Sequence, residues 1–305
     1  MPGHSLYAFK ASGLGMLLAA FVLIPLSGIN GMAKDLQGLR LELVSEQSAI
    51  VPGEVFNVGL MIHHEPGYHT YWKQPGIVGV PTALRWELPQ GFEAGELLYP
   101  GPEITHMFNI RAQGFERPVL LQTRIKAPRG LQPGSKVTLR AQASWMCCAK
   151  TCHPGQTALS LSLPVALTAQ PSPRWQPVFA AERARFAKPS ESWHAEASQG
   201  GLAVTLTLTP KGPEARSLTA EDLQDLHFFT LDGWINTDSP QEFTLNDQGG
   251  VNIRLCISEV YLGGEAPRAL QGVVGRGDKG WLRHSALQSL QISAPLRRTE
   301  VKAGS

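Results

Sequence analysis

Three of the four cysteines of the chain lie within six positions, in the stretch from Ser144 to Pro154. They are Cys147, Cys148 and Cys152. In a chain that leaves the cytoplasm, cysteines either lock a fold or perform redox or metal chemistry. A Cys148–Cys152 bridge would close a loop so short that its chain-entropy gain is only roughly 2 kcal/mol. This pair is therefore poorly placed to stabilise a fold and well placed to exchange, because exposed or strained disulfides are the labile ones.

The neighbours of the pair fit this chemistry. Lys150 lies between the two thiols, where a cation favours the thiolate that performs exchange or binds metal. Trp145 is a candidate shield for the sulfur atoms, with core packing as the alternative, and Pro154 is expected to end the loop and stiffen it. The vicinal Cys147 is awkward for every interpretation, since adjacent cysteines rarely pair.

A metal site is the second interpretation of the cluster. Cys147, Cys148, Cys152 and His153 form the only compact set of metal-ligand side chains, and thiolate with imidazole suits Cu(I). The remaining histidines are less suitable, because neighbours such as His63 and His64 face opposite sides of a strand. A purely structural disulfide is the third interpretation.

The first 33 residues are predicted to be an export signal. Lys10 supplies a positive charge, residues 14–26 are apolar, and residues 31–33 offer small side chains for cleavage before Lys34. The apolar run is shorter than the roughly 20 residues of a membrane span, and an uncleaved anchor is the alternative. We therefore expect a periplasmic protein.

Charge and length narrow the function classes further. Removing residues 1–33 takes away one cation and no acid, which changes the net charge from +2 to +1. Such a balance gives no sign of nucleic-acid binding. The remaining length exceeds a typical domain of roughly 100–150 residues and predicts two domains.

Period-two alternation of apolar and polar residues dominates the mature chain and predicts an all-β protein. Pro-Gly turn signals separate the short runs, which is typical of an antiparallel immunoglobulin-like β-sandwich. The alternating runs cover residues 39–43, 56–62, 84–88, 137–143 and 159–163, then 202–208, 251–257 and 290–292. The run at 137–143 delivers the chain to the cysteine cluster.

Two β-sandwich domains are therefore expected, at residues 34–169 and 191–295. Residues 170–190 contain four prolines around the segment 179–186 and are predicted to be a linker with one short helix. Residues 296–305 are predicted to be a flexible tail. Cys256 lies on the polar side of its predicted strand and is interpreted as a bystander thiol, with intermolecular pairing as the alternative.

Two sequence blocks resemble a known family. Residues 68–76 read Tyr-His-Thr-Tyr-Trp-Lys-Gln-Pro-Gly, and the later block has a tryptophan, a cysteine three positions on, a second cysteine four further, and then x-Pro. Trp145, Cys148, Cys152 and Pro154 match the latter pattern residue by residue. Both blocks resemble the N-terminal periplasmic region of the DsbD family, most closely the branch of the suppressor-of-copper-sensitivity proteins. Residues 269–274 resemble the companion β domain of that branch more loosely.

The resemblance implies a relay. In the family, the cysteine pair cycles between disulfide and dithiol without a further cofactor, and it passes electrons from a membrane-embedded electron-transfer protein to periplasmic thioredoxin-like or disulfide isomerase-type proteins. It also connects the chain with cytochrome c biogenesis and copper tolerance. Tyr71 and Trp72 are candidates for a cap over the pair, with core packing as the alternative. The multi-span membrane domain and the thioredoxin-like domain of the family do not occur in this sequence, and Cys147 departs from the family pattern.

Three functions follow as hypotheses. The first is a thiol–disulfide relay that works through Cys148 and Cys152. The others are a copper-binding or copper-tolerance protein and a non-catalytic interaction module with a structural disulfide. A hydrolase is not supported, because the sequence contains no nucleophile elbow, phosphate loop or HExxH zinc motif.

Overall fold

The computed structural model describes residues 30–31, 33–261 and 265–298. Most of the predicted export signal and of the predicted tail lies outside these residues. Two described segments lie within these predicted regions. Asn30–Gly31, inside the predicted export signal, forms a short strand, β1. Strand β19 (Ser289–Arg298) includes the first three residues of the predicted tail. None of the helices in the described part of the chain is long and apolar enough to cross a membrane.

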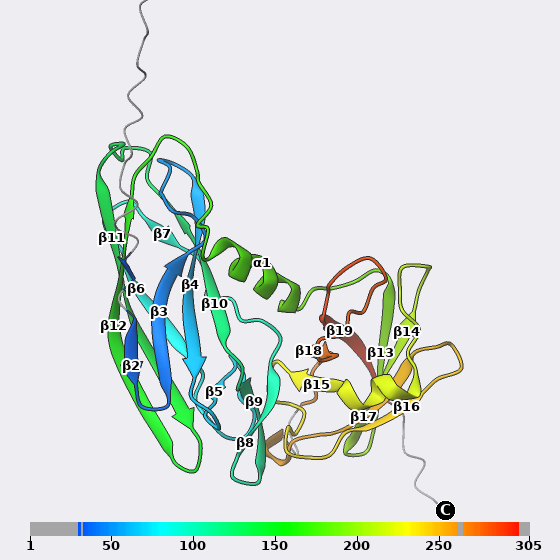
Figure 1. Cartoon of the computed structure of the whole chain (residues 1–305). Helices are drawn as coiled ribbons and strands as arrows, with labels where there is room; N and C mark the ends of the chain where they lie inside the picture. Colours follow the sequence, from blue (N-terminus) through cyan, green and yellow to red (C-terminus); the bar gives the residue numbers. More distant parts are fainter. Residues whose placement is uncertain (1–29, 32, 262–264, 299–305) are drawn as a thin grey trace, which may run out of the picture.

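The chain is mostly β-strand, as predicted, and its strands form two domains with one helix between them (Figure 1). The first domain contains β1, β2 (Lys34–Leu36), β3 (Leu39–Ser45), β4 (Val55–His64), β5 (Thr70–Tyr71), β6 (Ala83–Glu87), β7 (Glu93–Ala94), β8 (Glu103–Met107), β9 (Ile110–Phe115), β10 (Val119–Lys126), β11 (Lys136–Cys148) and β12 (Cys152–Pro164).

Two antiparallel sheets face each other in the first domain. Their strand orders are β1-β12-β11-β6 and β2-β3-β4-β10-β7. The predicted alternation puts every second side chain between the sheets, so that Leu41, Leu60, Leu121 and Leu161 are fully buried. A third, small sheet of order β5-β9-β8 lies at the end of the sandwich where β11 and β12 meet.

The linker helix α1 (Gln176–Arg185) is packed against the first domain. Pro177 occupies its first turn, where a missing backbone N–H costs nothing. Trp175 and Phe179 are buried against Met61 and Leu120 on the outer face of the sheet that contains β4 and β10. The predicted helix is present, and its apolar side fastens the linker to the first domain.

The second domain contains β13 (Trp193–Gly200), β14 (Ala203–Pro210), the 3-10 turn η1 (Ala220–Asp225), β15 (His227–Thr230), β16 (Glu242–Leu245), β17 (Val251–Cys256), the turn η2 (Glu259–Tyr261), β18 (Ala269–Gly275) and β19. Its strands follow the order β15-β18-β19-β13-β14-β17-β16. The pair β13 and β19 is parallel, whereas the other paired strands of this domain are antiparallel. Its core is a separate cluster around Leu206, Ile253 and Trp281.

Candidate thiol–disulfide site

Cys148 and Cys152 form a disulfide across the tip of the β11–β12 hairpin. Cys148 is the last residue of β11 and Cys152 the first of β12, and the two are paired in the ladder, with Cα atoms 4.1 Å apart. The three residues between them make the turn, which is closed by a bond from the Ala149 N–H to the Thr151 carbonyl. The local sequence thus folds both thiols onto the same end of the sandwich.

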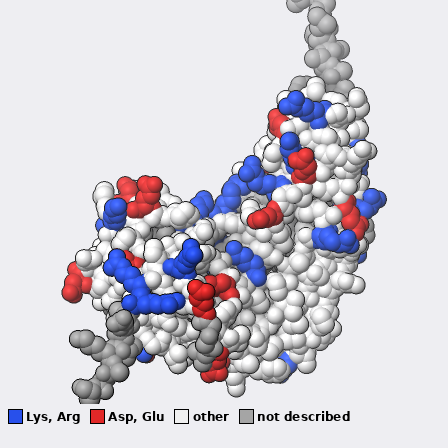
Figure 2. Space-filling view, turned by 180° about the vertical axis from the view of Figure 1, so that it is seen from behind, with Lys and Arg blue, Asp and Glu red and all other residues white. Residues whose placement is uncertain are grey.

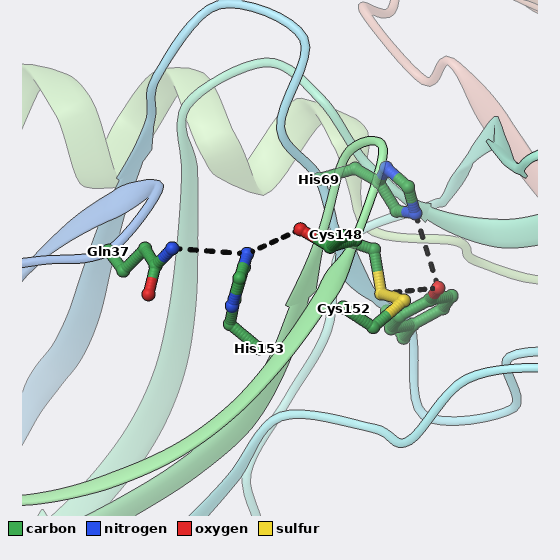
Figure 3. Close-up of a disulfide and its surroundings, with 7 residues drawn as sticks. Gln37, His69, Cys148, Cys152 and His153 are labelled. Atoms are coloured by element: carbon green, nitrogen blue, oxygen red, sulfur yellow. Dashed lines mark hydrogen bonds between the residues drawn. A yellow bond between two sulfur atoms is a disulfide. The ribbon is translucent and has the colours of Figure 1, made fainter.

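A short segment from a distant part of the chain holds the hairpin from one side. The backbone N–H of His69 donates to the carbonyl of Cys148 at 2.9 Å, and the N–H of Cys148 donates to the carbonyl of His69 at 3.0 Å. Strand β5 follows directly, and it brings the side chain of Tyr71 onto the disulfide. Figure 3 shows His69, Cys148 and Cys152 gathered at this end of the hairpin.

The Tyr71 hydroxyl donates a hydrogen bond to Cys148 Sγ at 3.1 Å. The phenol is fully buried, and this burial together with the nearby Cys147 raises the pKa of Tyr71 to about 12. The hydroxyl therefore keeps its proton at neutral pH and remains a donor. Because its single proton points to the sulfur, the contact of 3.3 Å to His69 Nε2 requires the imidazole to donate.

His69 completes a line of donors that ends at the sulfur. Burial, with a smaller contribution from the charge of His106, lowers the pKa of His69 to about 4. The ring is therefore neutral at pH 7, with its proton on Nε2. The order is His69 to Tyr71 to Cys148, and each donor points toward the disulfide.

The two sulfur-bearing residues differ in exposure. Cys148 is fully buried among Tyr71, Ala112 and Met146, whereas Cys152 is partly exposed. One end of the disulfide is thus covered by the protein and the other lies at the surface of the hairpin. Both ends lie on the side of β11 that faces the small sheet.

Cys147 lies on the opposite side of β11. Adjacent residues in a strand face opposite directions, so Cys147 and Trp145 point into the sandwich core with the leucines of both sheets. Burial and the charge of Glu65 raise the pKa of the Cys147 thiol to about 12, which keeps it protonated at neutral pH. The structure separates Cys147 from the pair.

The other predicted site residues are placed as follows. Lys150 and Pro154 are exposed on the hairpin, and Trp72 is buried in the sandwich core with its indole N–H on the Pro100 carbonyl. The His153 imidazole turns away from the sulfurs, toward Thr151 at 2.9 Å and Gln37 at 3.2 Å (Figure 3). Of the aromatic residues considered for a cap, Tyr71 reaches the disulfide, whereas Trp72 and Trp145 belong to the main core.

The four side chains considered for copper do not converge. Two of them share a disulfide, Cys147 faces the core, and the His153 ring bonds to Thr151 and Gln37. Within the described ranges, no group of three or more His, Cys, Asp or Glu residues is arranged to hold a metal ion.

Sequence reasoning missed the contribution of His69 and of Gly79. His69 precedes Tyr71 by two positions, which is the spacing of neighbours on one face of a strand and could have identified the pair. Gly79 has a positive φ of 96°, and a Cβ there would stand 2.3 Å from the Tyr71 ring. No local pattern indicates that this glycine covers Tyr71, because the contact depends on the tertiary fold.

Comparisons with known proteins relate this chain to thiol:disulfide interchange proteins. Residues 40–164 match the family model described as thiol:disulfide interchange protein DsbD, N-terminal. No match was found among curated protein sequences. The fold is similar to that in the crystal structure of the N-terminal periplasmic domain of ScsB from Proteus mirabilis, with a TM-score of 0.59 and 15% sequence identity over 89% of this chain and 98% of that one.

The resemblance noted from the two sequence blocks is thereby confirmed. The matched residues contain both the Tyr71 segment and the disulfide hairpin, and the structural similarity extends over most of both domains. Residues 40–164 of this chain therefore resemble the N-terminal domain of the DsbD thiol:disulfide interchange family.

Proposed function

We propose that this protein is a periplasmic thiol–disulfide relay in which Cys148 and Cys152 cycle between disulfide and dithiol. The observation that carries the proposal is the unequal burial of the two sulfur-bearing residues. Cys152 is partly exposed, whereas Cys148 is covered and receives a hydrogen bond from Tyr71. A disulfide built only for stability needs no donor aimed at one of its sulfurs.

The geometry favours attack at Cys152. A thiolate of the reducing partner forms a bond to Cys152 Sγ, the Cys148–Cys152 bond breaks, and Cys148 Sγ leaves as a thiolate. The Tyr71 hydroxyl, 3.1 Å away, then donates to a charged sulfur, and hydrogen bonds to charged groups are stronger than neutral ones. This contact lowers the energy of the leaving group.

The remaining steps release the oxidised partner and return the cysteine pair to its disulfide form. The second thiolate of the partner attacks its own mixed-disulfide sulfur, which releases Cys152 and leaves the partner oxidised by two electrons. The chain, now a dithiol, attacks the disulfide of an acceptor through Cys152, and Cys148 resolves the mixed disulfide. Two electrons and two protons pass from donor to acceptor, and no cofactor beyond the cysteine pair takes part.

The family supports the choice of partners. A membrane-embedded electron-transfer protein is the proposed donor, and periplasmic thioredoxin-like or isomerase-type proteins are the proposed acceptors. The structurally similar domain of ScsB is described as periplasmic, which supports the same compartment for this chain. An export signal within residues 1–33 is part of the proposal.

A redox titration in glutathione buffers tests the relay. Purified protein is equilibrated at defined potentials, alkylated and analysed by mass spectrometry, with Cys148→Ser and Cys152→Ser as variants that lack the pair. We expect a two-electron transition of Cys148 and Cys152 at a potential above about −300 mV, where exchanging carriers lie and structural bridges do not. A bridge that stays oxidised throughout would instead favour the interaction module.

Cys147→Ala is the matched control. This thiol lies one position from Cys148 but faces the core and stays protonated at neutral pH. We therefore expect the variant to keep the wild-type potential, and native Cys147 to resist alkylation until the protein unfolds. A changed potential would mean that Cys147 takes part in the exchange.

A further inference from the structure

The second domain contacts the segment that covers the disulfide, and one buried side chain bonds to both. Gln113 lies on β9 and is fully buried. Its Oε1 accepts from the Thr230 N–H at 2.8 Å, and its Nε2 donates to the Thr230 carbonyl at 3.0 Å. Thr230 ends β15, the edge strand of the second domain that lies beside the first domain in Figure 1.

The same amide also holds the chain that follows Tyr71. Gln113 Nε2 donates to the Gln74 carbonyl as well, so both its donors and its acceptor are used. The backbone of Gln113 adds two bonds to this segment, donating to Pro75 at 2.8 Å and accepting from the Trp72 N–H at 3.0 Å. Gln113 thus joins β9, residues 72–75 and the second domain at one point.

The covering segment then runs between the second domain and Tyr71. A Cβ on Gly76 would stand 2.3 Å from Thr237 Oγ1, so the backbone lies directly against the second domain there. Three positions later the backbone of Gly79 lies on the Tyr71 ring. A continuous path of contacts therefore leads from the second domain through residues 74–79 to Tyr71 and on to Cys148 Sγ.

Two further contacts support the same docking. The Arg111 N–H on β9 donates to Asp238 Oδ1 at 2.9 Å. Phe229 and Val273 of the second domain belong to the buried apolar cluster of the first domain. The interface is therefore a packed and hydrogen-bonded one, centred on the strand that pairs with β5.

We propose that Gln113 is a positioning residue that couples the docking of the second domain to the cover over Cys148–Cys152. The second domain then determines how readily a thiol reaches the disulfide. This inference rests on the proposed relay and assigns a role to the domain that carries no cysteine pair of its own.

Loss of the amide should loosen the cover. An apolar residue of similar size at position 113 leaves the Thr230 N–H, the Thr230 carbonyl and the Gln74 carbonyl without their partner, and buried polar groups without partners are costly. The docked state then gives way more often to an open state in which Tyr71 and residues 74–79 leave the sulfurs. A thiol can then reach the buried Cys148 as well as Cys152, and this added access exceeds the loss of the Tyr71 hydrogen bond to the leaving sulfur. We expect Gln113→Leu to be reduced by dithiothreitol roughly tenfold faster than wild type.

Gln241→Leu is the matched control. Gln241 makes the same two-bond clamp on β15, since it accepts from the Phe228 N–H and donates to the Phe228 carbonyl, both at 2.8 Å. This clamp lies wholly within the second domain. Its loss weakens that domain without touching the covering segment, so the reduction rate should stay at the wild-type value.

A double-mutant cycle tests the path through Tyr71. If docking acts by holding the Tyr71 ring, the rate effect of Gln113→Leu should become smaller in a Tyr71→Ala background, which lacks the ring. Thermal denaturation of each variant identifies general instability, which would lower the melting temperature without this dependence on Tyr71.

A pair of glycine variants keeps the proposal testable if Gln113→Leu fails to fold. Gly76→Ala and Gly67→Ala both add a side chain at positive φ, at 102° and 81° respectively, but only Gly76 has a neighbour, Thr237, within 4 Å. Faster reduction of Gly76→Ala alone would support the coupling.

Equal rates in both members of either pair would overturn the proposal. The equilibrium potential of the wild type is independent of these rates. A bridge that glutathione never reduces would reject the relay itself, whereas a reducible bridge with unchanged rates in the variants would reject only the coupling.

Discussion

At the scale of single residues, the site depends on one hydroxyl group. Tyr71 meets Cys148 Sγ at 3.1 Å, and its phenol stays protonated because its pKa is raised to about 12. The neutral His69 ring donates to the same hydroxyl, which leaves the phenol proton for the sulfur. A weak bond to a disulfide sulfur becomes a charge-assisted bond once that sulfur is a thiolate.

Replacing Tyr71 with phenylalanine should therefore lower the reduction potential. The change removes a donor that favours the reduced, charged form of Cys148. A hydrogen bond to a charged group contributes about 1.5–3 kcal/mol, which corresponds to a shift of roughly 30–60 mV toward more negative potentials. The measurement is a titration against glutathione at pH 7.

Tyr68→Phe is the matched control for this titration. The Tyr68 ring lies against Gly38 and near His153, and no hydrogen bond joins its hydroxyl to either sulfur. The reduction potential of the Tyr68→Phe variant should equal that of the wild type. An unchanged or raised potential in Tyr71→Phe would contradict the role assigned to the hydroxyl.

The cysteine pair could be predicted from its spacing and from the family pattern, and the structure contains the Cys148–Cys152 disulfide. The separation of Cys147 follows from strand geometry, because the alternation of β11 buries Trp145 and Cys147 together. The contact with Tyr71 could not be derived in this way. It joins residues 77 positions apart, and no local periodicity contains that information.

At the scale of elements, the alternating runs of the sequence correspond to the long strands, whereas the short strands contain no such alternation. The run predicted at 137–143 lies in the first part of β11, which continues to Cys148. The small sheet β5-β9-β8 was not predicted. Its strands contain the buried polar residues Thr70 and Gln113, which bond to His64 and Thr230 elsewhere in the chain instead of packing on an apolar face.

Two imidazoles, the partly buried His64 and the buried His69, connect the small sheet with the sandwich. His64 ends β4, where its Nδ1–H donates to the Arg117 carbonyl at 3.2 Å and its Nε2 accepts from Thr70 at 2.9 Å. Desolvation lowers the pKa of His64 to about 4, and burial does the same for His69. Both rings are neutral in the folded protein at pH 7.

Lowering the pH from about 6.5 toward 4 should therefore destabilise the protein, at pH values above the range in which carboxylates titrate. In the unfolded chain both imidazoles take up a proton near pH 6.5, whereas the folded state resists protonation until about pH 4. The unfolded state binds more protons between these values, so stability present above pH 6.5 is lost as the pH falls toward 4. Urea unfolding from pH 7 to pH 5 should show falling midpoints.

His64→Gln serves as the control for this dependence. The variant removes one imidazole of lowered pKa, so the slope of unfolding free energy against pH should fall by up to about 1.4 kcal/mol per pH unit. A midpoint that stays constant or rises on acidification would show that the rings are already charged in the folded state.

At the scale of the whole molecule, two domains could be predicted from length and alternation, but their arrangement could not. The interface combines apolar packing of Phe229 and Val273, hydrogen bonds that include those of one glutamine amide, and a chain of ion pairs, and none of these contacts leaves a periodic pattern. Figure 2 shows acidic and basic side chains interspersed on one face, in keeping with a net charge near zero. Specific ion pairs, rather than a general field, therefore act between the domains.

The chain of ion pairs begins on the linker helix and ends on the second domain. Arg185 of α1 bonds to Glu182 and to Glu103, both at 2.9 Å. Arg117 bonds to the same Glu103 at 2.7 Å and to Asp278 at 2.9 Å. The first three side chains are largely buried, with 15%, 9% and 20% exposed for Arg185, Glu182 and Glu103. Without Arg185, the carboxylates of Glu182 and Glu103 would be poorly solvated and would lose a cation that balances their charge.

Arg185→Met should accordingly cost about 2–4 kcal/mol at neutral pH, somewhat less than a fully buried pair, because Glu103 keeps Arg117. Burial already raises the pKa of Glu182, and Arg185 opposes this effect, so the variant should raise that pKa further. A raised carboxyl pKa favours folding below the unfolded value and costs stability as the pH rises through the folded one. The deficit against wild type should thus be larger at pH 7 than at pH 5.

Arg183→Met is the control, since its pair with Glu46 is more exposed and should contribute at most about 1 kcal/mol. Equal deficits for the two variants, or a deficit that grows on acidification, would show that Arg185 is not the group that compensates these buried charges.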